Sequence, residues 1–192
     1  KAKAAYDEGF YDDLVMDFQG AKRDGILRET KLEKLKSLKP AFDRSEAGSL
    51  TAGNSTALTD GAAAVLLASE DYAKQMNWPI LAYFIDGQSA AVNFVDGEGL
   101  LMAPTLAVGQ LLQRRHLSFA DFDFFEIHEA FAGQVLSTLK AWEDPQYCQN
   151  RLGLSAPLGA VPRDKMNIKG SSLATGHPFA ATGARITGTL AK

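Results

Sequence analysis

Short apolar runs separated by helical patterns constrain the fold of this chain more than any other feature. The runs at 62–68, 79–85 and 122–127 predict strands, although the first is so rich in alanine that a helix is a fair alternative. Strands that alternate with helices are typical of an α/β protein. We therefore expect a layered α/β fold with a largely parallel sheet.

Three segments between and after these runs predict helices. Residues 69–76 begin with Ser69, a good N-cap, and residues 104–116 carry Pro104 in the first turn, where proline is tolerated. A third helix is expected at 129–142. No internal repeat is evident, and the length allows one α/β core or one core with a small appendage.

The segment from Ala21 to Lys39 is basic, and Leu32, Leu35 and Leu38 recur in it at helical spacing. This pattern predicts an amphipathic helix that packs its leucines and exposes its lysines, and Pro40 ends it. An anion-binding segment is the alternative that the same lysines leave open.

Two further stretches are predicted as loops that bring backbone close to other groups. Residues 50–61 are small and polar, and Gly53 and Gly61 permit close approach of a neighbour while the Asn, Ser and Thr side chains can bond to backbone or ligand. Residues 92–102 carry two glycines and are expected to form a loop.

The size and charge of the chain exclude several classes of protein. Its 192 residues suffice for one substantial core, and its formal net charge of −3 argues against a nucleic-acid or membrane-surface role. No apolar run approaches the ~18 residues of a transmembrane segment. Because the chain opens at Lys1 without methionine and stops inside a helical pattern, we expect a piece of a longer polypeptide.

Cys148 is the only cysteine, which excludes an internal disulfide and a cysteine-based metal cluster. It lies in a polar stretch with no neighbour that would lower the pKa of its thiol. We interpret it as incidental rather than as a nucleophile.

The three histidines differ in their surroundings. His116 ends a predicted helix and is expected at the surface, where it complements the helix dipole. His128 follows a predicted strand, at the edge where α/β proteins place ligands, so structure and function are both open for it. A zinc-protease helix would need a second histidine at the position of Ala132, and we expect no metal site.

His177 lies in a stretch made almost entirely of Gly, Ala, Ser and Thr. Small residues let a substrate approach the backbone and leave the imidazole as the main reactive group within reach. The alternative is a tight helix-packing turn whose histidine satisfies a buried carbonyl. The glycines match neither the dinucleotide fingerprint nor the phosphate-binding loop.

Taken together, three segments resemble the thiolases. They are Thr-Ala-Gly-Asn-Ser-Thr-Ala-Leu-Thr-Asp-Gly-Ala-Ala-Ala at 51–64, Glu-Ile-His-Glu-Ala-Phe-Ala at 126–132 and Gly-His-Pro-Phe-Ala-Ala-Thr-Gly-Ala-Arg-Ile at 176–186. The likeness runs from about Leu32 to the end. The His-Glu-Ala-Phe form is most similar to the branch that acts in fatty-acid β-oxidation, including the trifunctional-complex β subunits.

The resemblance implies a duplicated α/β fold whose two halves carry different parts of one active site. On this basis residues 1–40 are expected to end the thiolase loop domain, and residues 41–192 to form a truncated C-terminal half with a mixed, largely parallel sheet. Coenzyme A is implied as a substrate, and no permanently bound cofactor is expected.

The resemblance also assigns roles to residues. His177 matches the histidine that takes the proton from a nucleophilic cysteine and helps hold the thioester oxygen, and His128 matches the residue that completes this oxyanion site. These are the tasks of an activated-nucleophile mechanism. Neither family cysteine has a match here, so the chain alone is expected to be inactive.

Six residues are implied, less directly, to contact substrate or coenzyme A. Arg28 is the candidate for the nucleotide phosphates, and the others would line the pantetheine tunnel. They are Arg28, Phe42, Ala52, Thr56, Ala130 and Phe131.

The expected activity is an acyltransferase that cleaves 3-oxoacyl-CoA with coenzyme A, or condenses acyl-CoAs in reverse. A non-catalytic thiolase-like protein that binds acyl-CoA or lipid is the alternative. The resemblance implies a homodimer or homotetramer, with another β-oxidation enzyme as one further partner. Bacterial cytoplasm and mitochondrial matrix both fit.

Overall fold

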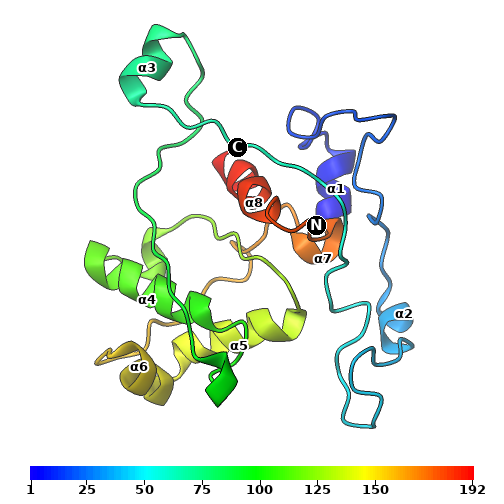
Figure 1. The fold of residues 1–192 in the computed structure, drawn as a ribbon, viewed down its shortest axis with the longest axis vertical. Coiled ribbons are helices and arrows are strands. Elements are labelled where there is room, and N and C mark those ends of the chain that lie inside the picture. The colour runs from blue at the N-terminus through cyan, green and yellow to red at the C-terminus, as the bar shows by residue number, and fades with distance from the viewer.

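The regular structure of the chain is helical (Figure 1). The computed structural model describes all residues, 1–192. Backbone pairing outside the helices is confined to five isolated bridges. The helices are α1 (Ala2–Asp7), α2 (Leu32–Lys36), α3 (Glu70–Gln75), η1 (Phe94–Asp96), α4 (Ala103–Arg115), η2 (Phe119–Asp121), α5 (Ala132–Glu143), α6 (Pro145–Leu152), α7 (Ser172–Thr175) and α8 (Thr182–Ala191).

The hydrophobic core lies where α4, α5 and α6 pack together at one end of the molecule (Figure 1). Its buried members come from both long helices and from the segments that follow them. The indole of Trp142 also donates a hydrogen bond to the carbonyl of Thr105, at 3.3 Å. The cluster consists of Leu112, Phe119, Val135, Leu139, Trp142, Val161 and Met166.

Cys148 is fully buried on α6. Its Sγ lies 3.5 Å from the carbonyl oxygen of Ala141 and 3.4 Å from that of Trp142, both on α5. A thiol in this position packs two helices together and has no access to a substrate. The sequence interpretation of Cys148 as incidental is consistent with this burial.

The predicted helices with clear start signals are confirmed. Ser69 caps α3 by accepting a hydrogen bond from the backbone N–H of Tyr72, at 3.3 Å. Pro104 lies in the first turn of α4, and exposed His116 ends that helix with φ of 53°. Helix α5 begins at Ala132, later than predicted, because the N–H of Ala132 bonds across the chain to Asn54 instead.

The basic amphipathic helix is much shorter than predicted, since only α2 forms within it. Gly25 lies in the part that stays irregular, and glycine disfavours a helix by about 1 kcal/mol relative to alanine. Leu35 and Leu38 do pack, against the bare backbone of Gly53. A Cβ there would lie 2.5 Å and 2.7 Å from their methyl groups.

The predicted strands do not form a sheet in this structure. Residues 62–68 and 79–85 have no regular structure and leave large apolar side chains exposed. Residues 122–127 make a single parallel bridge, between Phe125 and Met166, while Phe122, Phe125 and Ile127 pack on the core. A strand requires a neighbouring backbone to pair with. None of the five backbone bridges includes a residue of the first two segments.

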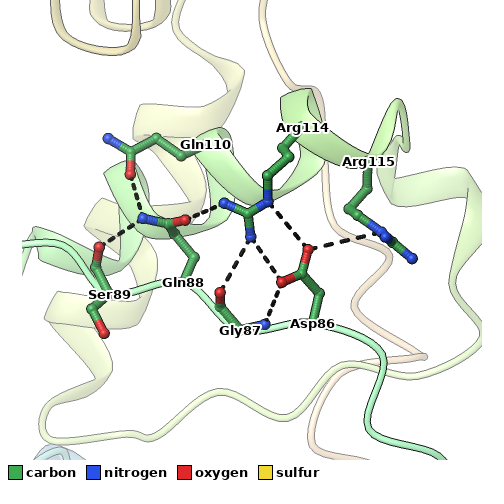
Figure 2. A network of polar contacts seen from close by, with 7 residues as sticks. All are labelled: Asp86, Gly87, Gln88, Ser89, Gln110, Arg114 and Arg115. Atoms are coloured by element: carbon green, nitrogen blue, oxygen red, sulfur yellow. Dashed lines mark hydrogen bonds and ion pairs between the residues drawn. The ribbon is translucent and has the colours of Figure 1, made fainter.

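Polar contacts link residues 86–89, which follow the predicted strand at 79–85, to the C-terminal part of α4 (Figure 2). The Arg114 guanidinium donates to Asp86 Oδ2 and to the carbonyl of Gly87, each at 3.2 Å, and also bonds to Gln88. Arg115 Nε lies 3.8 Å from the same carboxylate. The hydrogen bond from Arg114 is the main reason that the pKa of Asp86 lies below its ordinary value.

None of the helices is both long enough and apolar enough to cross a bilayer.

Candidate active site

Three segments that are distant in sequence converge through backbone hydrogen bonds. The N–H of Thr56 donates to the carbonyl of Ala130, and the N–H of His177 donates to the carbonyl of Ala57, both at 2.9 Å. Bridges join Ser55 to Phe131 and Leu58 to His177. The segment 54–58 therefore lies between the other two and brings their histidines to one place.

The imidazole rings of His128 and His177 lie side by side. Their centroids are 4.2 Å apart and their planes are inclined by 37°. The ring of Phe179 lies 4.6 Å from that of His177 and is itself largely exposed. Both histidines are half-buried, so each remains partly accessible to solvent.

His177 is fixed by the turn in front of it and by the helix behind it. Gly176 has φ of 87°, and a Cβ there would lie 2.6 Å from two atoms of the Thr59 side chain, so this position requires glycine. The Nδ1 of His177 lies 2.8 Å from the Oγ1 of Thr182, which is buried at the start of α8. The other ring nitrogen, Nε2, makes no hydrogen bond within the chain and can exchange a proton with a substrate or nucleophile.

His128 is fixed in the same way by α7. Its Nδ1 lies 2.7 Å from the Oγ of Ser172, a fully buried residue. Burial, with smaller contributions from His177 and from the positive charge of Arg185, lowers the pKa of His128 to about 4. The ring is therefore neutral near pH 7 and can donate one hydrogen bond without carrying charge.

Asn167 and Glu129 hold the His128 segment against α7. Buried Asn167, in the left-handed region with φ of 46°, donates to the carbonyl of Ile127 at 3.0 Å and to Glu129 Oε1 at 2.8 Å. Its Oδ1 accepts from the N–H of Ile127 at 2.8 Å. Glu129 Oε2 accepts from the N–H of Leu173 at 3.1 Å. Glu129 is thus used in the frame of the site rather than pointed at a substrate.

Glu126 is a second perturbed group in the same segment. Burial raises its pKa to about 7, against the opposing effect of a hydrogen bond from Ser171 Oγ at 3.2 Å. It lines a cavity of about 220 Å³ at the end of α8, together with Phe10 and Lys192.

Most of the predicted coenzyme A contacts gather beside the histidines. The ring of Phe42 packs edge to face on that of Phe131, with centroids 5.8 Å apart. The Thr56 hydroxyl donates to the carbonyl of Ser172 at 2.8 Å, so it is occupied within the chain. Ala130 accepts the bond from Thr56 already described. These residues form one wall next to His128.

Two predicted contacts are not joined to this group. Arg28 is exposed and makes no hydrogen bond or ion pair, and Ala52 is an exposed turn residue ahead of the bridged segment. In contrast, the hydroxyls of Ser55 and Thr59 are buried without a partner in the chain. These hydroxyls are the unused polar groups nearest to the site in sequence.

Sequence reasoning missed the residues that orient the histidines: Ser172, Thr182, Arg185, Asn167 and Glu129. The hydroxyls were hidden in a run of small residues, which is typical of close packing. One signal was available, because Arg185 is the only charged residue between Lys169 and Lys192. A lone arginine in an apolar segment requires buried acceptors.

No group of three or more His, Cys, Asp or Glu side chains is placed to hold a metal ion.

The chain belongs to the thiolase family. Residues 78–192 match the family's C-terminal domain, and residues 1–71 match its N-terminal domain. The fold agrees, because the chain superposes on thiolase structures over its whole length.

Individual relatives support the same conclusion. The chain is 42% identical over 198 aligned residues to a 3-ketoacyl-CoA thiolase of Serratia proteamaculans, covering 98% of this chain and 44% of that protein. It is 42% identical over 189 residues to the mitochondrial trifunctional enzyme subunit beta of Rattus norvegicus, covering 96% and 39%. The chain thus spans less than half the length of these relatives.

Two solved structures show the likeness in three dimensions. The dimeric peroxisomal thiolase of Saccharomyces cerevisiae matches with a TM-score of 0.78 and 34% identity, covering 100% of this chain and 45% of that one. Human mitochondrial 3-ketoacyl-CoA thiolase in complex with CoA matches with a TM-score of 0.72 and 32% identity, covering 99% and 44%.

Proposed function

We propose that this chain supplies the base and the oxyanion site of a thiolase-type acyltransferase, which cleaves 3-oxoacyl-CoA with coenzyme A or runs the reverse condensation. The observation that carries the proposal is the pair of imidazoles with centroids 4.2 Å apart, each anchored at Nδ1 and half-buried. Family membership and the named 3-ketoacyl-CoA thiolase relatives support it.

The reaction divides between the two histidines. His177 takes the proton of a cysteine thiol, and the thiolate attacks the 3-oxo carbon of the substrate. The bond between C2 and C3 breaks, its electron pair moves to C2, and the negative charge of the resulting enolate spreads to the thioester oxygen. Hydrogen bonds from His128 and protonated His177 stabilise that oxygen.

The remaining steps return the enzyme to its starting state. The departing acetyl-CoA enolate takes a proton at C2 from protonated His177, and the acyl chain remains as a thioester on the cysteine. Neutral His177 then takes the proton of the coenzyme A thiol, whose thiolate attacks this thioester and releases the shortened acyl-CoA. The cysteine leaves as a thiolate and regains its proton from His177. The cysteine comes from outside these 192 residues, because Cys148 is buried in the core.

Coenzyme A enters as a substrate beside His128. Its pantetheine arm lies along the wall formed by Phe42, Thr56, Ala130 and Phe131, and Ala52, by the resemblance to the family, lines the same tunnel. Arg28, exposed in the basic segment, meets the nucleotide phosphates. The CoA-bound human and Ascaris suum structures that resemble this chain support such a site.

The same family relations support the assembly and the location of the protein. A homodimer or homotetramer is expected, since one matching structure is described as dimeric, and the trifunctional β subunits suggest a multienzyme β-oxidation partner. Bacterial and mitochondrial relatives support the cytoplasm or the mitochondrial matrix. The division of residues 1–40 into the loop domain and 41–192 into the C-terminal core rests on the sequence resemblance alone, since the family models match 1–71 and 78–192.

A second function follows from the burial of Cys148. Without an exposed thiol, this chain is equipped to bind acyl-CoA or lipid rather than to turn it over. This alternative would be favoured if the chain bound coenzyme A but did not turn over substrate even when the rest of a thiolase supplied the cysteine.

The test is a chimera in which residues 1–192 replace the matching part of the Serratia proteamaculans relative, whose remaining sequence supplies the rest of the fold. We expect it to cleave acetoacetyl-CoA with coenzyme A, whereas the 192-residue chain alone does not. In the chimera, His177→Ala should lower kcat by about 10²-fold or more, because base and oxyanion donor are lost together. Loss of acetoacetyl-CoA measures both rates.

His116→Ala is the matched control, since His116 is an exposed histidine at the end of α4. It should leave kcat unchanged. Full activity of His177→Ala would refute the proposed base, and turnover by the unfused chain would refute the need for an outside cysteine.

A further inference from the structure

The hydroxyl of Ser172 joins His128 to Arg185. The Oγ lies 2.7 Å from His128 Nδ1 and accepts a hydrogen bond, also 2.7 Å long, from Arg185 Nη2. Ser172 is fully buried, so water does not compete for either bond. Whether this hydroxyl donates to Nδ1 or accepts from it therefore decides which ring nitrogen of neutral His128 carries the proton.

A count of protons decides the direction of the bond to His128. A guanidinium only donates, so the Oγ must accept from Arg185 and keeps its own proton to give elsewhere. The only other partner of this oxygen is His128 Nδ1. A buried hydroxyl that failed to donate would cost about 1–3 kcal/mol. Ser172 thus donates to Nδ1, and the ring proton of neutral His128 is on Nε2.

The bonds of His177 give the opposite result. The Thr182 hydroxyl donates to the carbonyl of Pro178, at 3.3 Å, so its contact with His177 Nδ1 is one in which it accepts. His177 therefore carries its ring proton on Nδ1 and presents a lone pair at Nε2. Two neighbouring imidazoles are held in opposite tautomers, one ready to donate and one ready to accept.

Arg185 also ties the two histidines together. Its Nη1 donates to the carbonyl of Gly176, directly before His177, at 2.8 Å, while Nη2 holds Ser172. Thr56 bonds to the carbonyl of Ser172 at 2.8 Å and fixes its backbone. The hydroxyl of Ser172 is therefore held in place from two sides.

We propose that Ser172, held by Arg185, is a positioning residue that fixes His128 as the neutral tautomer with its proton on Nε2. In this form His128 donates one hydrogen bond to the substrate thioester oxygen while His177 accepts a proton beside it. The use of that hydrogen bond rests on the proposed function, but the tautomer does not.

The tautomer can be read directly in the 192-residue chain by NMR. Histidine labelled with nitrogen-15 gives separate signals for protonated and unprotonated ring nitrogens, and the chain contains three histidines. Near neutral pH we expect His128 to show an unprotonated Nδ1 and a protonated Nε2, and His177 the reverse. A protonated Nδ1 in wild-type His128 overturns the proposal without recourse to any variant.

Substitution of Ser172 tests the cause. Ser172→Ala should give His128 a mixture of both tautomers, whereas Ser172→Thr keeps a hydroxyl and should restore the wild-type pattern. His177 serves as the internal reference and should not change. An unaltered His128 spectrum in a folded Ser172→Ala chain would also overturn the proposal.

Kinetics of the chimera separate this inference from the proposed function. Ser172→Ala should lower kcat about 10-fold with little change in KM, less than the ~10²–10³-fold expected for loss of a whole oxyanion donor, and Ser172→Thr should recover it. An inactive wild-type chimera with the predicted tautomer would refute the function and leave the positioning role of Ser172 intact.

Discussion

Glu126 and His128 lie two residues apart, and burial moves their pKa values in opposite directions. The pKa of Glu126 rises from 4.5 to about 7, and that of His128 falls from 6.5 to about 4. Burial is the largest cause for both, since each is made less ready to carry charge. Near pH 6 both side chains are therefore mainly neutral, although one is an acid and the other a base.

This opposition predicts how stability depends on pH. Between about pH 4.5 and 7 the folded chain binds more protons at Glu126 than the unfolded chain, so the contribution of Glu126 to stability falls as pH rises. Between about pH 4 and 6.5 the unfolded chain binds more protons at His128, so that contribution rises with pH. The two trends offset each other from about pH 4.5 to 6.5.

Removing one group should reveal the other. In Glu126→Gln the free energy of unfolding should rise with pH over this window more steeply than in wild type, and in His128→Gln it should fall. Urea unfolding at a series of pH values measures both slopes. His116→Gln, in an exposed position, is the control and should match wild type. Parallel profiles for all four proteins would contradict the opposing shifts.

For individual residues, the sequence identified His128 and His177 as candidate site residues but did not identify the side chains that hold them. His128 and His177 were found because their motifs resemble those of a family, and no local pattern shows that such distant residues meet. Ser172 and Thr182 were missed because a hydroxyl among small residues is equally typical of tight packing. Their roles depend on where Arg185 and the carbonyl of Pro178 lie, which is tertiary information.

Among the elements, α6 has boundaries set almost wholly by its own sequence. Asp144 caps it by accepting a hydrogen bond from the N–H of Tyr147 at 2.9 Å, Pro145 occupies the first turn, and Gly153 ends it with φ of 67°. Each of these residues suits its position for a local reason. The helix places Cys148 in the core, so its start affects packing as well as helicity.

The cap of α6 can be tested by substitution. Asp144→Ala should lower the free energy of unfolding by about 1 kcal/mol, because a backbone N–H in the first turn loses its acceptor. Asp164→Ala, which removes an exposed turn aspartate, should stay within about 0.5 kcal/mol of wild type. Urea unfolding of the two variants gives the comparison. Equal losses would mean that charge, and not the cap, is responsible.

Local signals also explain why helices were predicted correctly and strands were not. Helices α3 and α4 were predictable because their signals are local: Ser69 caps α3, and α4 has a first-turn proline and helical periodicity. The predicted strands at 62–68 and 79–85 had suitable composition, but a strand also needs a partner backbone that composition does not specify. The prediction of the basic helix was right about packing and wrong about length. Leu35 and Leu38 pack on Gly53 as an apolar face should, but only Leu32–Lys36 is helical.

Across the whole molecule, buried apolar side chains are distributed unevenly. The hydrophobic cluster lies among α4, α5 and α6, whereas α3 and the segments on either side of it extend away from that core (Figure 1). Leu66, Leu67 and Phe84 are each more than 70% exposed. The stability of this chain should therefore depend on one end of it, and the site is attached to that end through the segment 122–132.

Two substitutions of large apolar residues test this distribution. Leu139 is buried in the cluster, and Leu139→Ala should cost about 2–5 kcal/mol through lost contacts and the cavity left behind. Phe84 is 77% exposed, so Phe84→Ser should change the free energy of unfolding by less than about 0.5 kcal/mol, although it removes a larger side chain. Urea unfolding of the 192-residue chain measures both. A loss of 2 kcal/mol or more in Phe84→Ser would show that residues 79–85 are packed in solution, in which case the sequence prediction of a strand there would stand.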